Sequence, residues 1–211
     1  MDEFLKHMEE PIVLVRVGSG QTIRDFKIPK GLLCKQSQWF RSALKSDTFQ
    51  EGKTGVINLP DDTPGAFTSF FYYIHTERLA FPEVDVTGSN VSEELGQRLR
   101  NAMEAWIFAD KYKLPHMQDC AMSALCDFLS SATHRVPTLK PEYLELSFTK
   151  TAEGSSLRML VADYLVTRID SNKNDIGQVV STLAILPGVM QALHEAQSFH
   201  YAAVARDGKL I

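Results

Sequence analysis

Residues 26–40 read FKIPKGLLCKQSQWF, and the spacing of the apolar side chains changes inside this stretch. Phe26 and Ile28 alternate with polar neighbours, which is typical of a strand with one buried face. Pro29 ends the strand because proline has no N–H to donate to a neighbouring strand. Beyond the proline the apolar side chains recur at helical intervals, so the stretch predicts a strand that passes directly into helices. Ser37 is the expected N-cap of the second helix.

The flanking sequence predicts two further strands and another helix. Residues 12–17 read IVLVRV, a β-branched run that ends at a glycine-containing turn over residues 18–20. This run and the strand at Phe26 therefore form a hairpin. Residues 56–59 (VINL) predict a third short strand that ends at the turn residues 60–62 (PDD). Pro64 then opens a helix, because proline is tolerated in the first helical turn.

The rest of the chain has a mainly helical pattern. We expect helices from Ser92 to the break at Leu114 and Pro115, from there to about residue 130, and over residues 156–169, 178–186 and 189–204. An exposed loop is expected at about residues 81–91, and a linker is expected around Pro137 and Pro141. Together with the strands, this order predicts an α+β fold. Six aromatic side chains are expected in the core: Trp39, Phe40, Phe67, Phe70, Phe71 and Trp106.

The composition is that of a globular domain and argues against nucleic-acid-binding, disulfide-rich and membrane-spanning proteins. The chain has 211 residues, of which 44% are hydrophobic and 23% charged, as in globular domains. Its net charge of -4, without a Lys/Arg run, argues against a nucleic-acid partner. The three cysteines do not form a disulfide framework, residues 1–10 do not resemble a signal peptide, and no apolar stretch could span a membrane. We therefore expect an intracellular protein of the cytoplasm or nucleus, with no membrane partner.

The motifs that carry chemistry are incomplete. Residues 52–54 (GKT) imitate the end of a phosphate-binding loop, but Asp47 stands where that loop needs glycine. His194 and Glu195 imitate a zinc-protease motif, but Ser198 stands where the second histidine is needed. We find no catalytic residues, no metal ligands and no cofactor motif. Residues that are distant in the sequence can still converge in the fold, so the absence of a motif does not by itself exclude an enzyme.

The stretch at residues 26–40 resembles the signature of the BTB/POZ domain family, in which two leucines, a serine and an aromatic–phenylalanine pair follow a strand. Further similar segments follow in the family's order at residues 49–51, 56–62, 66–67, 74–76 and 108–114. The tail at residues 153–161 resembles that of fungal members. The resemblance implies a small sheet packed with helical hairpins in a domain at residues 1–131, with its core at about 11–130. A helical C-terminal extension at residues 132–211 follows.

The resemblance also implies a protein-interaction module and not an enzyme. Many members bind cullin-3 and present substrates for ubiquitination, and their loop after the third core helix carries a hydrophobic–x–Glu motif. Phe49, Gln50 and Glu51 match that motif. The implied function is an adaptor or scaffold of a cullin-3-type ubiquitin ligase, with Phe49 anchored in a groove of the partner. In the alternative interpretation, Phe49 covers the domain's own core and Glu51 is merely solvated.

A second function stays open, because other members self-associate or act in assemblies such as transcriptional co-regulation without cullin. Some dimerise through an extra N-terminal helix and a swapped strand, but here about ten residues with few apolar positions precede the first strand, which argues against that dimer. Some transcriptional members use a charged pocket, for which Lys30 is the candidate residue. Pro29 stands where the family usually has histidine, and Glu10 and Pro11 stand where it usually has aspartate.

Overall fold

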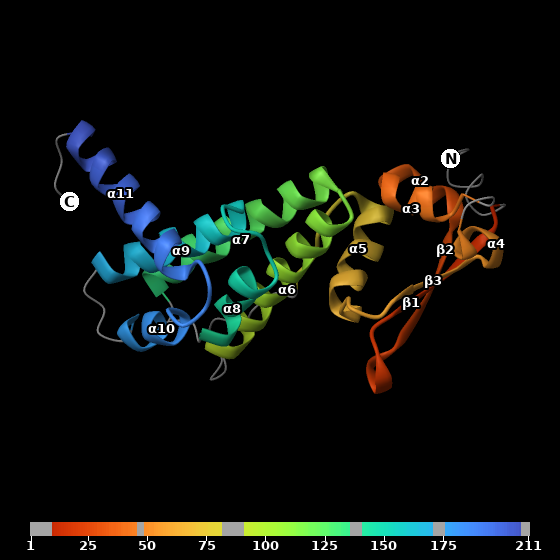
Figure 1. The fold of residues 1–211 in the computed structure, drawn as a ribbon, viewed down its shortest axis with the longest axis horizontal. Coiled ribbons are helices and arrows are strands. Elements are labelled where there is room, and N and C mark those ends of the chain that lie inside the picture. The colour runs from red at the N-terminus through yellow and green to blue at the C-terminus, as the bar shows by residue number, and fades with distance from the viewer. Residues whose placement is uncertain (1–9, 46–48, 82–90, 136–140, 171–175, 208–211) are drawn as a thin grey trace. The chain divides into compact units, whose positions relative to one another are not determined.

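The structure, a computed structural model, describes residues 10–45, 49–81, 91–135, 141–170 and 176–207 (Figure 1). The elements in chain order are β1 (Ile12–Val17), the 3-10 turn η1 (Gly20–Thr22), β2 (Arg24–Pro29), α2 (Lys30–Gln36), α3 (Gln38–Ala43), α4 (Gln50–Thr54), β3 (Val56–Leu59), α5 (Pro64–Thr76), α6 (Val91–Lys111), α7 (Pro115–Arg135), α8 (Pro141–Thr149), α9 (Ser156–Asp170), α10 (Ile176–Leu183) and α11 (Val189–Asp207). The expected α+β class is confirmed. The loop expected at residues 81–91 lies almost entirely outside the described residues.

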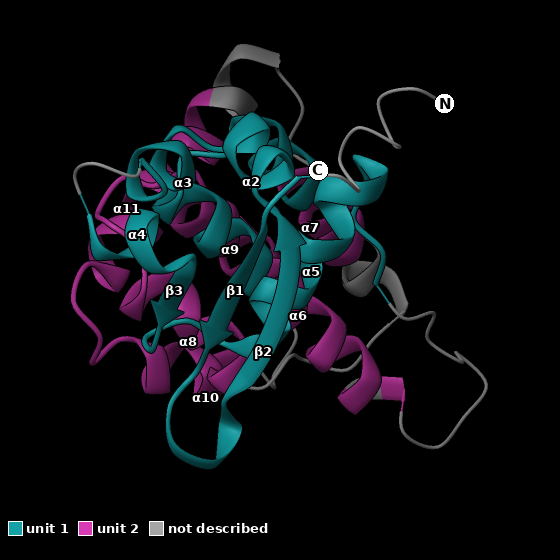
Figure 2. Cartoon of the chain, turned by 90° about the vertical axis from the view of Figure 1, so that its right-hand side faces the viewer, with its two compact units in different colours: residues 1–81, 104–121 teal, residues 82–103, 122–211 magenta. Residues whose placement is uncertain are grey.

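The three strands form one sheet in the order β2-β1-β3 (Figure 2). Strand β1 pairs antiparallel with β2 and parallel with β3, and Val15 lies opposite both Phe26 and Ile57. Alternate residues of β1, Val13, Val15 and Val17, are buried. The β-branched run at residues 12–17 therefore forms the centre of the sheet, with one face turned to the core.

Aromatic rings fill the core behind the sheet. The Phe40 ring stacks on Phe70 and on Tyr112, with centroid separations of 5.5 and 5.2 Å. Phe108 joins the cluster at 4.4 Å from Tyr112. The predicted core residues Phe40, Phe67, Phe70 and Trp106 are confirmed as buried. Residues from α3, α5 and α6 thus meet in one hydrophobic cluster.

Two of the predicted core residues lie elsewhere. Trp39 is 41% exposed, so its assignment to the core was wrong. Consecutive residues of a helix point about 100° apart, so α3 turns Phe40 inward and leaves Trp39 at the edge. The Trp39 ring still packs edge-on against Phe40 and Tyr112. Phe71 is only half-buried and lies against the Phe26 ring at 5.8 Å.

The predicted N-cap of α3 is confirmed, and the caps of α3 and α5 each also join two elements. Ser37 is buried, and its hydroxyl oxygen accepts a hydrogen bond from the Trp39 N–H at 3.1 Å. The same hydroxyl donates to the carbonyl of Tyr112 at 2.9 Å, which ties α3 to the end of α6. Thr63 caps α5 by accepting from the Ala66 N–H, and its hydroxyl donates to Glu104 of α6.

Packing divides the chain into two units (Figure 2). The N-terminal unit comprises residues 1–81 and 104–121, and the C-terminal unit comprises residues 82–103 and 122–211. The expected domain boundary at residue 131 stays a prediction. Among the residues that the structure describes, no helix is both long enough and apolar enough to span a membrane.

The C-terminal unit corrects the expected linker. Helix α7 continues to Arg135, and α8 begins at Pro141, where the second proline indicated a linker. Pro137, the first proline of the expected linker, lies outside the described residues. Pro141 is the first residue of α8, a position where the missing N–H costs no intrahelical hydrogen bond. Tyr143 of α8 is buried against Gly96 of α6, where an added Cβ would overlap the tyrosine ring. Glycine at position 96 therefore allows the close approach of these two helices.

Candidate functional site

The hydrophobic–x–Glu motif lies at the beginning of α4. Phe49 is the residue before the helix, has an extended backbone and is 50% exposed. Gln50 is exposed and Glu51 is half-buried in the first helical turn. Half of the Phe49 side chain is therefore open to a partner, which favours the interface interpretation over the one in which Phe49 covers the core.

Helix α4 is held on the sheet by its C-terminal end. Gly55 has a left-handed backbone with φ of 67°, and its N–H donates to the Glu51 carbonyl at 2.9 Å. The carbonyl of Gly55 accepts a hydrogen bond from the Leu14 N–H of β1, also at 2.9 Å. The Thr54 hydroxyl donates to the Gln50 carbonyl. These bonds attach the motif to a strand instead of leaving it on a free loop, so its side chains are presented on a fixed backbone.

Lys30, the candidate pocket residue, is the first residue of α2 and is half-buried. Its N–H donates to the Pro11 carbonyl, and the neighbouring Gly31 N–H donates to the Glu10 carboxylate. Burial raises the pKa of the Cys34 thiol on the same helix, and the nearby charges of Lys30 and Arg41 oppose that shift. Lys30 therefore lies in a cluster of mixed charge at the beginning of α2.

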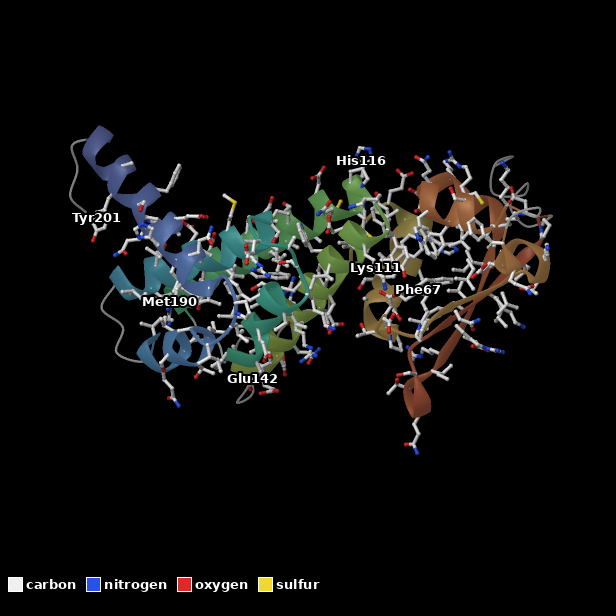
Figure 3. All side chains as sticks on the ribbon, in the orientation of Figure 1. Phe67, Lys111, His116, Glu142, Met190 and Tyr201 are labelled. Carbon is white, nitrogen blue, oxygen red and sulfur yellow. The ribbon has the colours of Figure 1, made fainter. Side chains whose placement is uncertain are left out.

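A second polar cluster lies beside the aromatic core. The Tyr112 hydroxyl donates to Asp62 Oδ2 at 2.6 Å, and Lys111 Nζ lies 2.8 Å from the same oxygen. Lys111 lies near the end of α6, and its side chain is labelled in Figure 3. The Asp62 side chain is 8% exposed. Burial, and then the hydrogen bond to Asp62, raise the pKa of Tyr112 far above its ordinary value. The predicted turn at residues 60–62 thus also supplies the buried carboxylate of Asp62, which accepts the Tyr112 hydrogen bond.

The cavities lie elsewhere. Three cavities are lined by residues 126–199 of the C-terminal unit. Burial raises the pKa of Cys34, Tyr73 and Tyr112, and none of these three side chains lines any of the three cavities. No group of three or more His, Cys, Asp or Glu side chains within the described ranges is arranged to hold a metal ion.

Exposed apolar side chains on the C-terminal helices were not predicted from the sequence. Phe199 is 71% exposed on α11, and Met190 and Tyr201 of the same helix are also exposed (Figure 3). The helical spacing of α11 could have predicted this exposure. Val189 and Leu193 lie on the buried face of the helix, and Met190 and Phe199 fall outside that face. Trp39 is a further exposed aromatic residue that sequence reasoning had assigned to the core.

The family model of the BTB/POZ domain matches residues 5–129, which is more than half of the chain. No curated protein matches the chain. The matched residues include β1 to β3, α2 to α6, and α7 as far as Leu129. Phe49, Gln50 and Glu51 lie within the match, whereas the cavities are lined mostly by residues beyond it.

Proposed function

Because the chain belongs to the BTB/POZ domain family, whose domains are protein-interaction modules, we propose that it is an adaptor or scaffold of a cullin-3-type ubiquitin ligase. The observation that carries the proposal is the half-exposed Phe49 at the beginning of α4. Gln50 and Glu51 complete the interface beside it. A large apolar ring that is already partly exposed contributes to binding when a partner's groove removes it from water.

The chemistry of the three residues fits a directed contact. Phe49 supplies apolar area, while the carboxylate of Glu51 accepts hydrogen bonds from a partner's N–H or O–H groups. Gln50 is exposed and can donate and accept at the rim. The short helix α4 is attached to β1 through Gly55, so binding requires little ordering of this backbone.

Calorimetric titration of the full chain with the N-terminal domain of cullin-3 tests the proposal. We expect binding in the wild type, and we expect Phe49→Ala and Glu51→Ala to weaken it while the circular dichroism spectrum stays unchanged. Ile12→Ala is the matched control, because Ile12 is 54% exposed on the same unit and lies outside the motif. A loss of binding that is equal in the control and in Phe49→Ala would contradict the proposed site.

A second candidate function is interaction in an assembly without cullin, such as self-association or transcriptional co-regulation. The observation that favours it is the exposure of Met190 and Tyr201 on α11, which are 60% and 66% exposed and line none of the three cavities. They are separated by about three helical turns, so they share one face of the helix, and exposed apolar side chains on one face commonly mark a site of association. Sedimentation of the purified chain over a range of concentrations tests self-association directly.

A further inference from the structure

Two adjoining cavities form a groove along α9. One is a cavity of about 560 Å³ that extends to α11, and the other, of about 410 Å³, extends to α7. Both are lined by Leu160 and Asp163, so they adjoin at this part of α9. We call this the α9 groove. Its other lining residues are Met159, Tyr164 and Thr167 on α9, Ala192, Glu195, Ala196 and Phe199 on α11, and Cys126, Leu129 and Ser130 on α7.

The helical spacing of the lining residues gives the groove its form. On α9 they lie at positions 160, 163, 164 and 167, and on α11 at positions 192, 195, 196 and 199. Each set has the i, i+3, i+4, i+7 spacing of one helix face. The side chains of Ala192 and Ala196 are small, so they leave space in the cavity beside α11. A face of this kind is roughly two turns, or about 10 Å, long.

The charge of the groove is acidic. The charged residues that line the two cavities are Asp163 and Glu195, and both are exposed. Glu195 Oε1 also accepts a hydrogen bond from the exposed Gln191 side chain at 2.9 Å, a neutral partner that leaves the negative charge in place. His200 of α11 lies with its Nε2 2.6 Å from Oδ1 of Asp163, which ties α11 to α9 at the rim. Phe199, exposed beside them, adds an aromatic wall. The groove thus combines an apolar floor with an acidic rim.

From this combination we propose that the α9 groove binds an amphipathic helix of another protein, with apolar residues at i, i+3, i+4 and i+7 and lysine or arginine beside them. The apolar positions of such a helix fill a groove between two helices, as in helix-in-groove recognition. Its lysine or arginine side chains lie opposite Asp163 and Glu195, and this charge pairing sets the position of the bound helix along the groove. This site is separate from the Phe49 motif, and it does not rest on cullin binding.

A second copy of the chain suits the groove less well. It would bring the same two carboxylates to a symmetric contact, and the chain as a whole carries a net charge of -4. Like charges brought together in an interface oppose association. The acidic rim therefore selects a basic partner over a copy of this chain.

Fluorescence anisotropy of labelled peptides tests the proposal with the full chain. The probe is a peptide of leucine and lysine, about 18 residues long, with leucines at i, i+3, i+4 and i+7. A leucine–glutamate peptide of the same pattern and a shuffled leucine–lysine peptide are the controls. We expect the patterned leucine–lysine peptide to bind at least roughly tenfold more tightly than either control, a difference that titration resolves readily.

Three variants locate the binding. Glu195→Lys is expected to reduce the preference for the basic peptide, because it reverses one charge of the rim and leaves the contact between Asp163 and His200 in place. Ala196→Trp is expected to weaken binding by filling the cavity beside α11. Glu145→Lys changes an exposed acid of α8 outside the groove and should leave binding unchanged. Circular dichroism confirms that each variant is folded.

Two results would overturn the proposal. The first is equal affinity for the patterned and shuffled basic peptides, or an affinity that Glu145→Lys reduces as much as the groove variants do, because either would indicate a general charge effect. The second is concentration-dependent sedimentation of the wild type that Ala196→Trp abolishes, because the occupant would then be a second copy of the chain.

Discussion

At the scale of single residues, Tyr112 connects the aromatic core to a buried charge. Its ring packs on Phe40 and Phe108, and its hydroxyl donates to Asp62. Its backbone carbonyl accepts from Ser37, the cap of α3. One residue at the end of α6 therefore joins α3, α6 and the turn that precedes α5.

We expect Tyr112→Phe to lower the free energy of unfolding by about 1.5–3 kcal/mol, the usual contribution of a hydrogen bond to a charged group. Urea unfolding at neutral pH measures this change. Tyr72→Phe removes a hydroxyl from an exposed ring and should change the free energy by less than about 0.5 kcal/mol. Equal effects of the two substitutions would show that the Asp62 hydrogen bond does not stabilise the fold.

The raised pKa of Tyr112 also predicts a pH dependence. An unfolded tyrosine ionises near pH 10, whereas burial and Asp62 keep the folded hydroxyl protonated to higher pH. Above about pH 10 the unfolded chain loses a proton that the folded chain retains, so ionisation favours unfolding. The contribution is complete below that pH and declines as the pH rises. Wild-type stability should therefore fall between pH 9 and 11 more steeply than that of Tyr112→Phe, as measured by urea midpoints.

At the scale of elements, much of the fold followed from the sequence. The hairpin of β1 and β2, the strand β3, the Ser37 cap of α3 and the helix α9 were predicted, because period-2 and period-3.6 patterns and cap residues are local signals. Helix α8 was missed because Pro141 was interpreted as part of a linker, although proline serves equally well at a helix start. The position of Trp39 could not be predicted, because the packing of a six-residue helix depends on distant partners.

Close packing between helices of the C-terminal unit depends on Gly96. We expect Gly96→Ala to destabilise the protein by about 1–3 kcal/mol, because the new methyl group overlaps the buried Tyr143 ring and overpacking outweighs the better helix propensity of alanine. Thermal unfolding measures the effect. Gly177→Ala in α10, where an added Cβ meets no atom within 4 Å, is the control and should be neutral or slightly stabilising. A stabilising Gly96→Ala would contradict this packing.

Arg158 of α9 holds the turn after α8. It is 7% exposed, and its guanidinium donates to the carbonyls of Phe148, Thr151 and Pro187. We expect Arg158→Met to cost about 3 kcal/mol or more, because it leaves these acceptors without their donor. Urea unfolding checks this value. Arg24→Met, at an exposed position of β2, should change stability by less than about 0.5 kcal/mol, and a similarly small effect at Arg158 would be a contradiction.

At the scale of the whole molecule, the two candidate surfaces differ in how far the sequence predicted them. The motif at Phe49, Gln50 and Glu51 was visible as a local pattern, but its exposure depends on how α4 attaches to β1 through Gly55, which no local pattern records. The α9 groove was not predicted, since its walls come from α7, α9 and α11, which are separated in the chain. Local signals predict elements, whereas surfaces built from several elements require the packing.

The proposal that the chain is a cullin-3 adaptor depends most on Phe49. The decisive measurement is the ratio of the dissociation constants of Phe49→Ala and the wild type for the N-terminal domain of cullin-3. We expect the wild type to bind and the ratio to reach roughly 30 or more, the effect of truncating an aromatic anchor worth about 2 kcal/mol. A ratio near one, or a folded wild type that produces no binding heat, would contradict the proposed function.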